Sequence, residues 1–97
     1  MPISLEELRA KRGPIVQAAE EHRARNVRVF GSVARGALEP WSDVDLLIDV
    51  LPGHSLLDRA GLTLALQELL GTPVDVVTEK QLREAIRDRA LREAVAL

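Results

Sequence analysis

Hydrophobic and polar residues alternate in three short segments of the chain, which predicts three β-strands. Residues 27–30 alternate, are rich in β-forming residues, and run directly into a glycine. Residues 43–50 place aliphatic side chains on one side of an extended chain, and three aspartates and one leucine on the other. Residues 74–77 repeat the pattern with a single aspartate between valines. The sequence therefore predicts strands whose outer sides carry carboxylates.

Three helices are predicted around these strands. A capping box begins the first at Ser4, and Gly13-Pro14 is expected to kink or restart it. The second begins after Ser55, is apolar over a wide arc, and ends at Gly71. The third runs from about Glu79 to the end of the chain. This order predicts an α/β (α+β) fold with a small mixed sheet and helices packed on one face.

Chain length and composition agree with one compact domain that spans residues 1–97. Hydrophobic residues make up 46% of the chain and charged residues 29%, which is typical of a globular protein. The chain has one Trp, one Phe and no Tyr, so the core must be built from aliphatic side chains. Length leaves no room for a second core.

Charge and residue usage exclude several classes of function. The net charge of −2 gives no sign of a nucleic-acid surface, which usually shows a basic excess. The chain has no cysteine, which excludes disulfides and thiolate metal sites. Its apolar runs are too short for a membrane span, and its N-terminus is no signal peptide, so we expect a cytoplasmic protein.

Two segments carry the chemical signal. Gly31 and Ser32 follow a strand directly, and a turn of this kind presents backbone N–H groups and a hydroxyl to a phosphate. In the second segment Val44 points to the core, so Asp43 and Asp45 emerge on the same side of their strand. Two carboxylates at this spacing repel each other unless a hard divalent cation such as Mg²⁺ offsets their charge.

A third carboxylate completes the candidate site. Asp75 lies between valines in the middle of a predicted strand, where an unpaired carboxylate is unfavourable. If that strand lies beside the strand of Asp43 and Asp45, all three carboxylates share one face. Asp75 could then hold the metal that activates an acceptor hydroxyl, or take up its proton.

Taken together, Gly31-Ser32, ten intervening residues and Asp43-x-Asp45 resemble the signature of the DNA-polymerase-beta-like nucleotidyltransferase superfamily. The surrounding residues resemble more narrowly the minimal nucleotidyltransferases, or MNT proteins. This resemblance implies a polymerase-beta-like fold, three metal-binding carboxylates matching Asp43, Asp45 and Asp75, two Mg²⁺ ions and ATP as substrate. It also implies a partner, a small helical HEPN ribonuclease toxin, to which the MNT antitoxin transfers AMP on a tyrosine.

Several residues keep two interpretations. Arg35 either reaches the triphosphate or is solvated, and Asp49 is expected to be exposed or salt-bridged rather than part of the site. Trp41 either stacks on a base or partner or folds back on the core, and Ser42 is expected to act locally. The charged residues 79–93 indicate first a solvated helix face, whereas the residues at the very end belong to the core or to a partner surface.

The leading hypothesis is a Mg²⁺-dependent enzyme that transfers AMP from ATP to a hydroxyl of a partner protein, with Gly31, Ser32 and Arg35 on the nucleotide. The rival hypothesis is a non-catalytic antitoxin that inhibits a ribonuclease by binding, with a vestigial nucleotide site. Transfer to RNA or a small molecule is disfavoured by the acidic charge balance and the lack of an acceptor domain. Self-modification on tyrosine is excluded because the chain has none.

Overall fold

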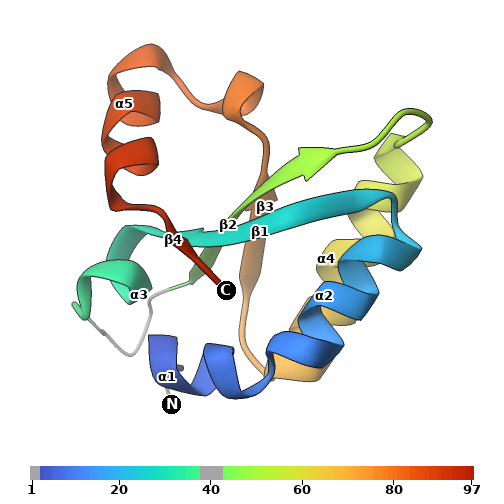
Figure 1. Ribbon diagram of the computed structural model, residues 1–97, viewed down its shortest axis with the longest axis horizontal. Helices are drawn as coiled ribbons and strands as arrows, with labels where there is room; N and C mark the ends of the chain where they lie inside the picture. Colours follow the sequence, from blue (N-terminus) through green and yellow to red (C-terminus); the bar gives the residue numbers. More distant parts are fainter. Residues whose placement is uncertain (1–2, 38–42) are drawn as a thin grey trace.

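A four-stranded mixed sheet forms the centre of the computed structural model, which describes residues 3–37 and 43–97. Its strand order is β3-β2-β1-β4. The antiparallel pairs are β1–β2 and β1–β4, whereas β2 and β3 are parallel. The strands are β1 (Ala24–Phe30), β2 (Val44–Val50), β3 (Val74–Val77) and β4 (Val95–Ala96) (Figure 1). The predicted mixed sheet is confirmed, whereas Trp41 and Ser42 lie outside the described residues.

Local signals in the sequence account for several helix ends. The helices are α1 (Leu5–Ala10), α2 (Arg12–Glu21), α3 (Gly31–Arg35), α4 (Leu56–Leu70), α5 (Glu84–Glu93) and the 3₁₀ turn η1 (Glu79–Gln81). Capping boxes precede α1 and α4, and α4 ends at Gly71 in the left-handed conformation, as predicted. The first helix restarts at Lys11 rather than at Gly13-Pro14, which fall inside the first turn of α2, where a proline is tolerated.

The main core lies between one face of the sheet and helices α1, α2 and α4 (Figure 1). Its fully buried members are aliphatic, as the scarcity of aromatic residues requires. The predicted alternation in β2 is confirmed for Val44, Leu46 and Ile48, which are all buried in this core. The other side of β2 therefore faces away from the main core, and that side carries the aspartates.

The C-terminal part of the chain differs from the prediction of one continuous helix. Leu82 is extended, α5 ends at Glu93, and Val95 and Ala96 form β4 by pairing with β1. The unpaired edge of β1 offers backbone hydrogen bonds that a continued helix would leave unused. This pairing brings α5 against the opposite face of the sheet, where Ala90 packs on Phe30 and Leu47. Helices therefore cover both faces of the sheet, and the prediction that they pack on one face is wrong in this respect.

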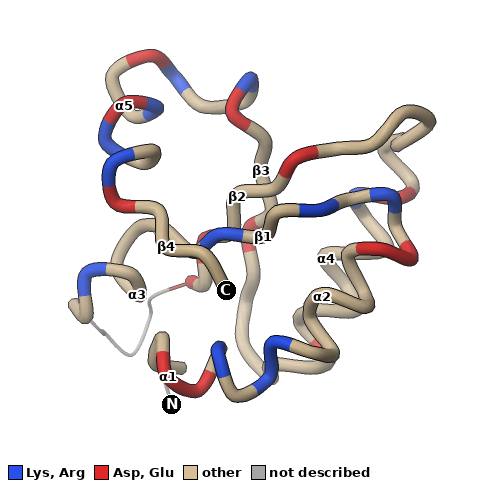
Figure 2. The backbone as a smooth tube through the Cα atoms, viewed as in Figure 1, with Lys and Arg blue, Asp and Glu red and all other residues tan. Residues whose placement is uncertain are grey.

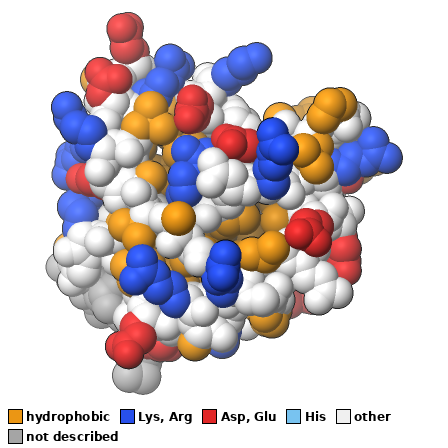
Figure 3. All heavy atoms as spheres, in the orientation of Figure 1, with side chains coloured by type: hydrophobic (Ala, Val, Ile, Leu, Met, Phe, Trp, Pro, Cys, Tyr) orange, Lys and Arg blue, Asp and Glu red, His pale blue; other side chains and the backbone are white. Residues whose placement is uncertain are grey.

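The described surface agrees with the charge balance of the sequence. On the face drawn in Figure 3, basic side chains of the described residues are interspersed with acidic and hydrophobic ones. Figure 2 shows acidic and basic residues mixed along α5 as well. Among the described residues, no helix is both long and apolar enough to pass through a membrane.

Candidate active site

The turn after β1 comes into direct contact with a carboxylate of β2. Phe30 ends β1 and is the register partner of Asp45, so the next residue, Gly31, lies at the side of that aspartate. Gly31 has φ +72°, a conformation that favours glycine. A Cβ atom at this position would collide with the Asp45 carboxylate. Glycine is therefore required twice here, for the turn and for the close approach.

The parallel pairing of β2 with β3 brings the third carboxylate to the same place. Asp45 and Asp75 are register partners, so their side chains leave the sheet side by side on one face. Asp43 precedes β2 and is exposed, and Val44 between the two aspartates is buried. The condition stated for Asp75 is therefore met, and the structure brings all three aspartates to one region beside Gly31.

Burial and like charge together make the ionised form of Asp45 unfavourable. The pKa of Asp45 is raised from 3.8 to about 6, first by burial and then by the negative charges of Asp75 and Asp43, while Arg35 acts in the opposite direction. A raised pKa means that the ionised carboxylate is held in an unfavourable environment. A bound cation would remove that penalty.

The residues fit a magnesium ion in a particular way. Among the described residues, no three acidic or histidine side chains converge into a ready-made metal site. Mg²⁺ does not need one, because it is usually held by one or two carboxylates together with phosphate oxygens and water. The uncompensated charge around Asp45 and its hard oxygen donors suit such a site.

Arg35, a candidate for nucleotide binding, is held by a residue that the sequence analysis did not single out. Its Nη1 atom donates to Oε2 of Glu93 at 2.9 Å, and Oε1 of Glu93 accepts from Nε of Arg89 at 3.0 Å. Glu93 and Arg89 both belong to α5, the helix whose mixed charges were expected to form a solvated face. The four-residue spacing of Arg89 and Glu93 was a visible signal for their pairing, but it carried no information on the contact with Arg35.

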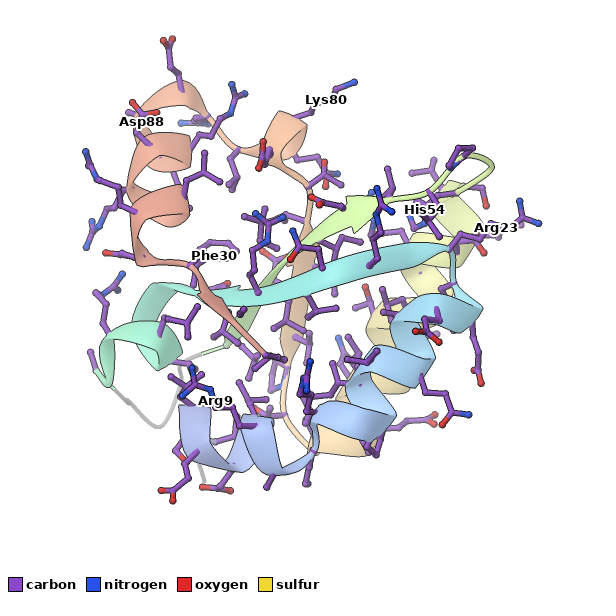
Figure 4. The ribbon with its side chains drawn as sticks, viewed as in Figure 1. Arg9, Arg23, Phe30, His54, Lys80 and Asp88 are labelled. Carbon is purple, nitrogen blue, oxygen red and sulfur yellow. The ribbon has the colours of Figure 1, made fainter. Side chains whose placement is uncertain are left out.

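Asp49 does not join the site, although it has the strand parity of Asp45. It accepts hydrogen bonds from Arg28 at 2.8 Å and from Asn26 at 2.9 Å. The predicted salt-bridged role is confirmed. Asp49 also lines a cavity of about 530 Å³ at the far end of β2, together with Arg59 and Lys80 (the latter labelled in Figure 4). None of the candidate site residues lines that cavity, so its volume alone does not mark the site of chemistry.

A turn suited to a phosphate chain and carboxylates suited to a divalent cation thus meet at one end of the sheet. Phosphoryl and nucleotidyl transfer require such an arrangement.

Residues 15–97 match the family described as "Nucleotidyltransferase domain". A Methanocaldococcus jannaschii protein, provisionally named protein adenylyltransferase MJ0435, is 37% identical over 93 residues, which cover 96% of this chain and 97% of that protein. Protein adenylyltransferase MntA of Thermococcus cleftensis is 41% identical over 76 residues, which cover 78% and 77%.

Solved structures give the same result. One protein described provisionally as a minimal nucleotidyltransferase is 48% identical, with a TM-score of 0.85 over 98% of this chain and 97% of that chain. The chain therefore belongs to the nucleotidyltransferase domain family and, within it, to the minimal nucleotidyltransferases (MNT). It is a nucleotidyltransferase enzyme with the polymerase-beta-like fold that the sequence motif implied.

Two more distant structures share the fold. One is a toxin–antitoxin complex with AMP-PNP (17% identity, TM-score 0.71, 87% of this chain and 69% of that chain). The other is the complex of a tri-AMPylated Shewanella oneidensis HEPN toxin with an MNT antitoxin (14% identity, TM-score 0.66, 91% and 69%).

Proposed function

We propose that this nucleotidyltransferase transfers AMP from ATP to a tyrosine hydroxyl of a HEPN-type ribonuclease toxin, and that it acts as the antitoxin. The names of the two relatives support a protein as the acceptor, and the two distant complexes support a nucleotide and a HEPN toxin as partners. The absence of tyrosine from this chain agrees with an acceptor supplied by another protein.

One observation carries the proposal: Asp45 and Asp75 are register partners directly beside the Gly31 turn. In our proposal Gly31, Ser32 and Arg35 bind the triphosphate. Asp43, Asp45 and Asp75 hold the metal ions, two Mg²⁺ in the full site. Mg²⁺ bound there supplies positive charge that offsets the charge of the phosphates during transfer.

The transfer itself requires a defined exchange of bonds. The acceptor hydroxyl oxygen forms a bond to the α-phosphorus of ATP, the bond from that phosphorus to the β-phosphate oxygen breaks, and pyrophosphate leaves. The hydroxyl proton passes to a carboxylate, for which we propose Asp75. Asp75 is exposed on the edge strand β3, where an incoming protein chain reaches it more readily than the half-buried Asp45.

The test uses the purified protein together with a purified HEPN-type toxin as the candidate acceptor. After incubation with ATP and Mg²⁺, the intact mass of the partner is expected to rise by one or more AMP groups. Label in the α-phosphate of ATP is expected on the partner, and label in the γ-phosphate is not. Removal of Mg²⁺ by a chelator should stop the reaction, and replacement of the acceptor tyrosine by phenylalanine should remove the mass gain.

Variants of this chain separate catalysis from binding. Asp43→Asn is expected to abolish transfer with the fold intact. Asp49→Asn, near the far end of the following strand β2, is the matched control and should retain transfer. Labelled AMP on the partner at the parent rate with Asp43→Asn would refute the mechanism. Tight binding of the partner with no gain in mass would instead support inhibition without catalysis.

A further inference from the structure

A small cavity between the Gly31 turn and α5 has no role in the proposal so far. Its volume is about 240 Å³. Gly31 and Arg35 line one side, Arg89 and Glu93 line the other, and Phe30 contributes to the wall. In Figure 4 Phe30 lies at the end of β1 on the side of α5. Because Gly31 is also in contact with the Asp45 carboxylate, the cavity is adjacent to the reacting centre.

A single carboxylate organises the two cations of this cavity. Glu93 uses one oxygen for Arg35 and the other for Arg89, and only 21% of its side chain is exposed. The hydrogen bond from Arg89, and then the contact with Arg35, hold the pKa of Glu93 below its ordinary value, so it is ionised in the folded protein. Two guanidinium groups and one carboxylate leave a net positive charge at the cavity.

Both guanidinium groups keep donors for a ligand. Each guanidinium has five N–H donors, and Glu93 engages a single nitrogen atom of each arginine. The Arg89 side chain is 62% exposed and the Arg35 side chain 40%, so water reaches their remaining donors. Forked N–H groups of this kind match the oxygens of phosphate groups, whereas a neutral base or ribose does not require two cations.

We infer that Arg89 is a second nucleotide-binding residue that, together with Arg35, holds the β- and γ-phosphates of the nucleotide, and that Glu93 is the residue that positions both guanidinium groups. This inference rests on the proposed function only in taking a nucleoside triphosphate as the substrate. The β- and γ-phosphates leave as pyrophosphate, so the two arginines contact the leaving group.

The test compares the binding of ATP and AMP, each with Mg²⁺ and without an acceptor, by equilibrium dialysis. Arg89→Gln is expected to weaken ATP binding about tenfold, since a charge-assisted hydrogen bond is worth about that factor. Its affinity for AMP should stay unchanged, because AMP lacks both distal phosphates. Arg89→Lys keeps the charge but not the fork, and an intermediate loss is expected.

Glu93→Gln distinguishes a positioning role of Glu93 from a purely electrostatic one, because the two predict changes in ATP affinity of opposite sign. It removes a negative charge, so simple electrostatics predicts tighter ATP binding, whereas loss of positioning predicts weaker binding by a few-fold. The control is Asp88→Asn on the same helix, which has the same charge change on an exposed residue labelled in Figure 4. Thermal unfolding of each variant checks the fold. If Glu93→Gln fails to fold, the ATP and AMP affinities of Arg89→Gln alone test the inference.

Three results would overturn the inference: parent-like ATP binding by Arg89→Gln, equal losses of ATP and AMP affinity, or tighter ATP binding by Glu93→Gln. Failure of the proposed function has a different signature. The parent protein would then bind ATP with the predicted dependence on Arg89 but would transfer no AMP to the partner.

Discussion

Replacement of Asp45 by asparagine tests whether burial and the neighbouring carboxylates make the ionised form of Asp45 unfavourable. The amide has nearly the shape of the carboxylate but no charge. Asp45 is half-buried and has Asp75 and Asp43 as charged neighbours, with Arg35 as the opposing positive group. In the absence of a metal ion, we therefore expect Asp45→Asn to stabilise the fold at neutral pH rather than to weaken it.

The magnitude follows from the pKa. A rise from 3.8 to about 6 corresponds to at most about 3 kcal/mol of unfavourable free energy in the ionised folded state. Asp45 is only half-buried, and solvent screens its interactions, so we expect a gain of about 1 kcal/mol. For a chain of this size, that gain raises the melting temperature by roughly 4–8 °C.

The dependence on pH has a defined sign. Between about pH 4 and pH 6 the folded state binds more protons than the unfolded state, so the stability of the parent protein falls as pH rises through this interval. Asp45→Asn has no carboxylate at this position and therefore does not lose stability in this way as the pH rises. Its advantage should be present above pH 6 and should disappear as the pH falls below 3.8, where Asp45 becomes protonated in both states.

Thermal and urea unfolding of the parent and Asp45→Asn at pH 4, 6 and 8, with a chelator present, measure this difference. Asp49→Asn is the control, because Asp49 is stabilised by Arg28 and its loss should lower stability instead. Added Mg²⁺ should stabilise the parent more than Asp45→Asn. A lower melting temperature for Asp45→Asn at pH 8, or a difference that does not change with pH, would refute the reasoning.

Three further substitutions test the site turn, the main core and a helix cap by thermal or denaturant unfolding. Gly31→Ala must place a Cβ atom against Asp45 at φ +72°. We expect the free energy of unfolding to fall by roughly 1–3 kcal/mol and ATP binding to weaken. Parent-like stability would contradict the close approach of Gly31 to Asp45. Leu66→Ala opens a cavity in the main core and should cost about 2–5 kcal/mol, whereas Leu64→Ala on the exposed side of the same helix should change little. Ser55→Ala removes the cap of α4 and should cost about 1 kcal/mol, and an unchanged melting temperature would show that the capping box contributes nothing.

Much of the fold and half of the site were predictable from local sequence. The three main strands, the capping boxes and the glycine after α4 depend on interactions within a few residues, and all are confirmed. The common direction of Asp43 and Asp45 follows from the alternation of a strand, which is equally local. The Gly31-Ser32 turn was predicted as a phosphate-binding turn, whereas the close approach of Gly31 to Asp45 was identified only by the structure.

The C-terminal region was not predictable in the same way. A two-residue strand has no period to detect, so the pairing of Val95 and Ala96 with β1 left no pattern in the sequence. The mixed charges of α5 correctly indicated an exposed helix, but exposure does not tell which neighbour a charged side chain meets. The contact between Glu93 and Arg35 joins residues 58 positions apart and depends on the docking of α5 beside the site, where β4 pairs with β1 and Ala90 packs on Phe30.

The sequence by itself determined the chemistry available to this protein: a glycine–serine turn after a strand, a pair of aspartates on one side of the next strand, and a third aspartate further along. The tertiary structure decided how these groups combine. Parallel pairing of β2 and β3 placed Asp75 in register with Asp45, and the return of the chain along β1 placed Glu93 against Arg35. The reason is that strand pairing and helix docking depend on burial summed over the whole core, which no single segment of the sequence contains.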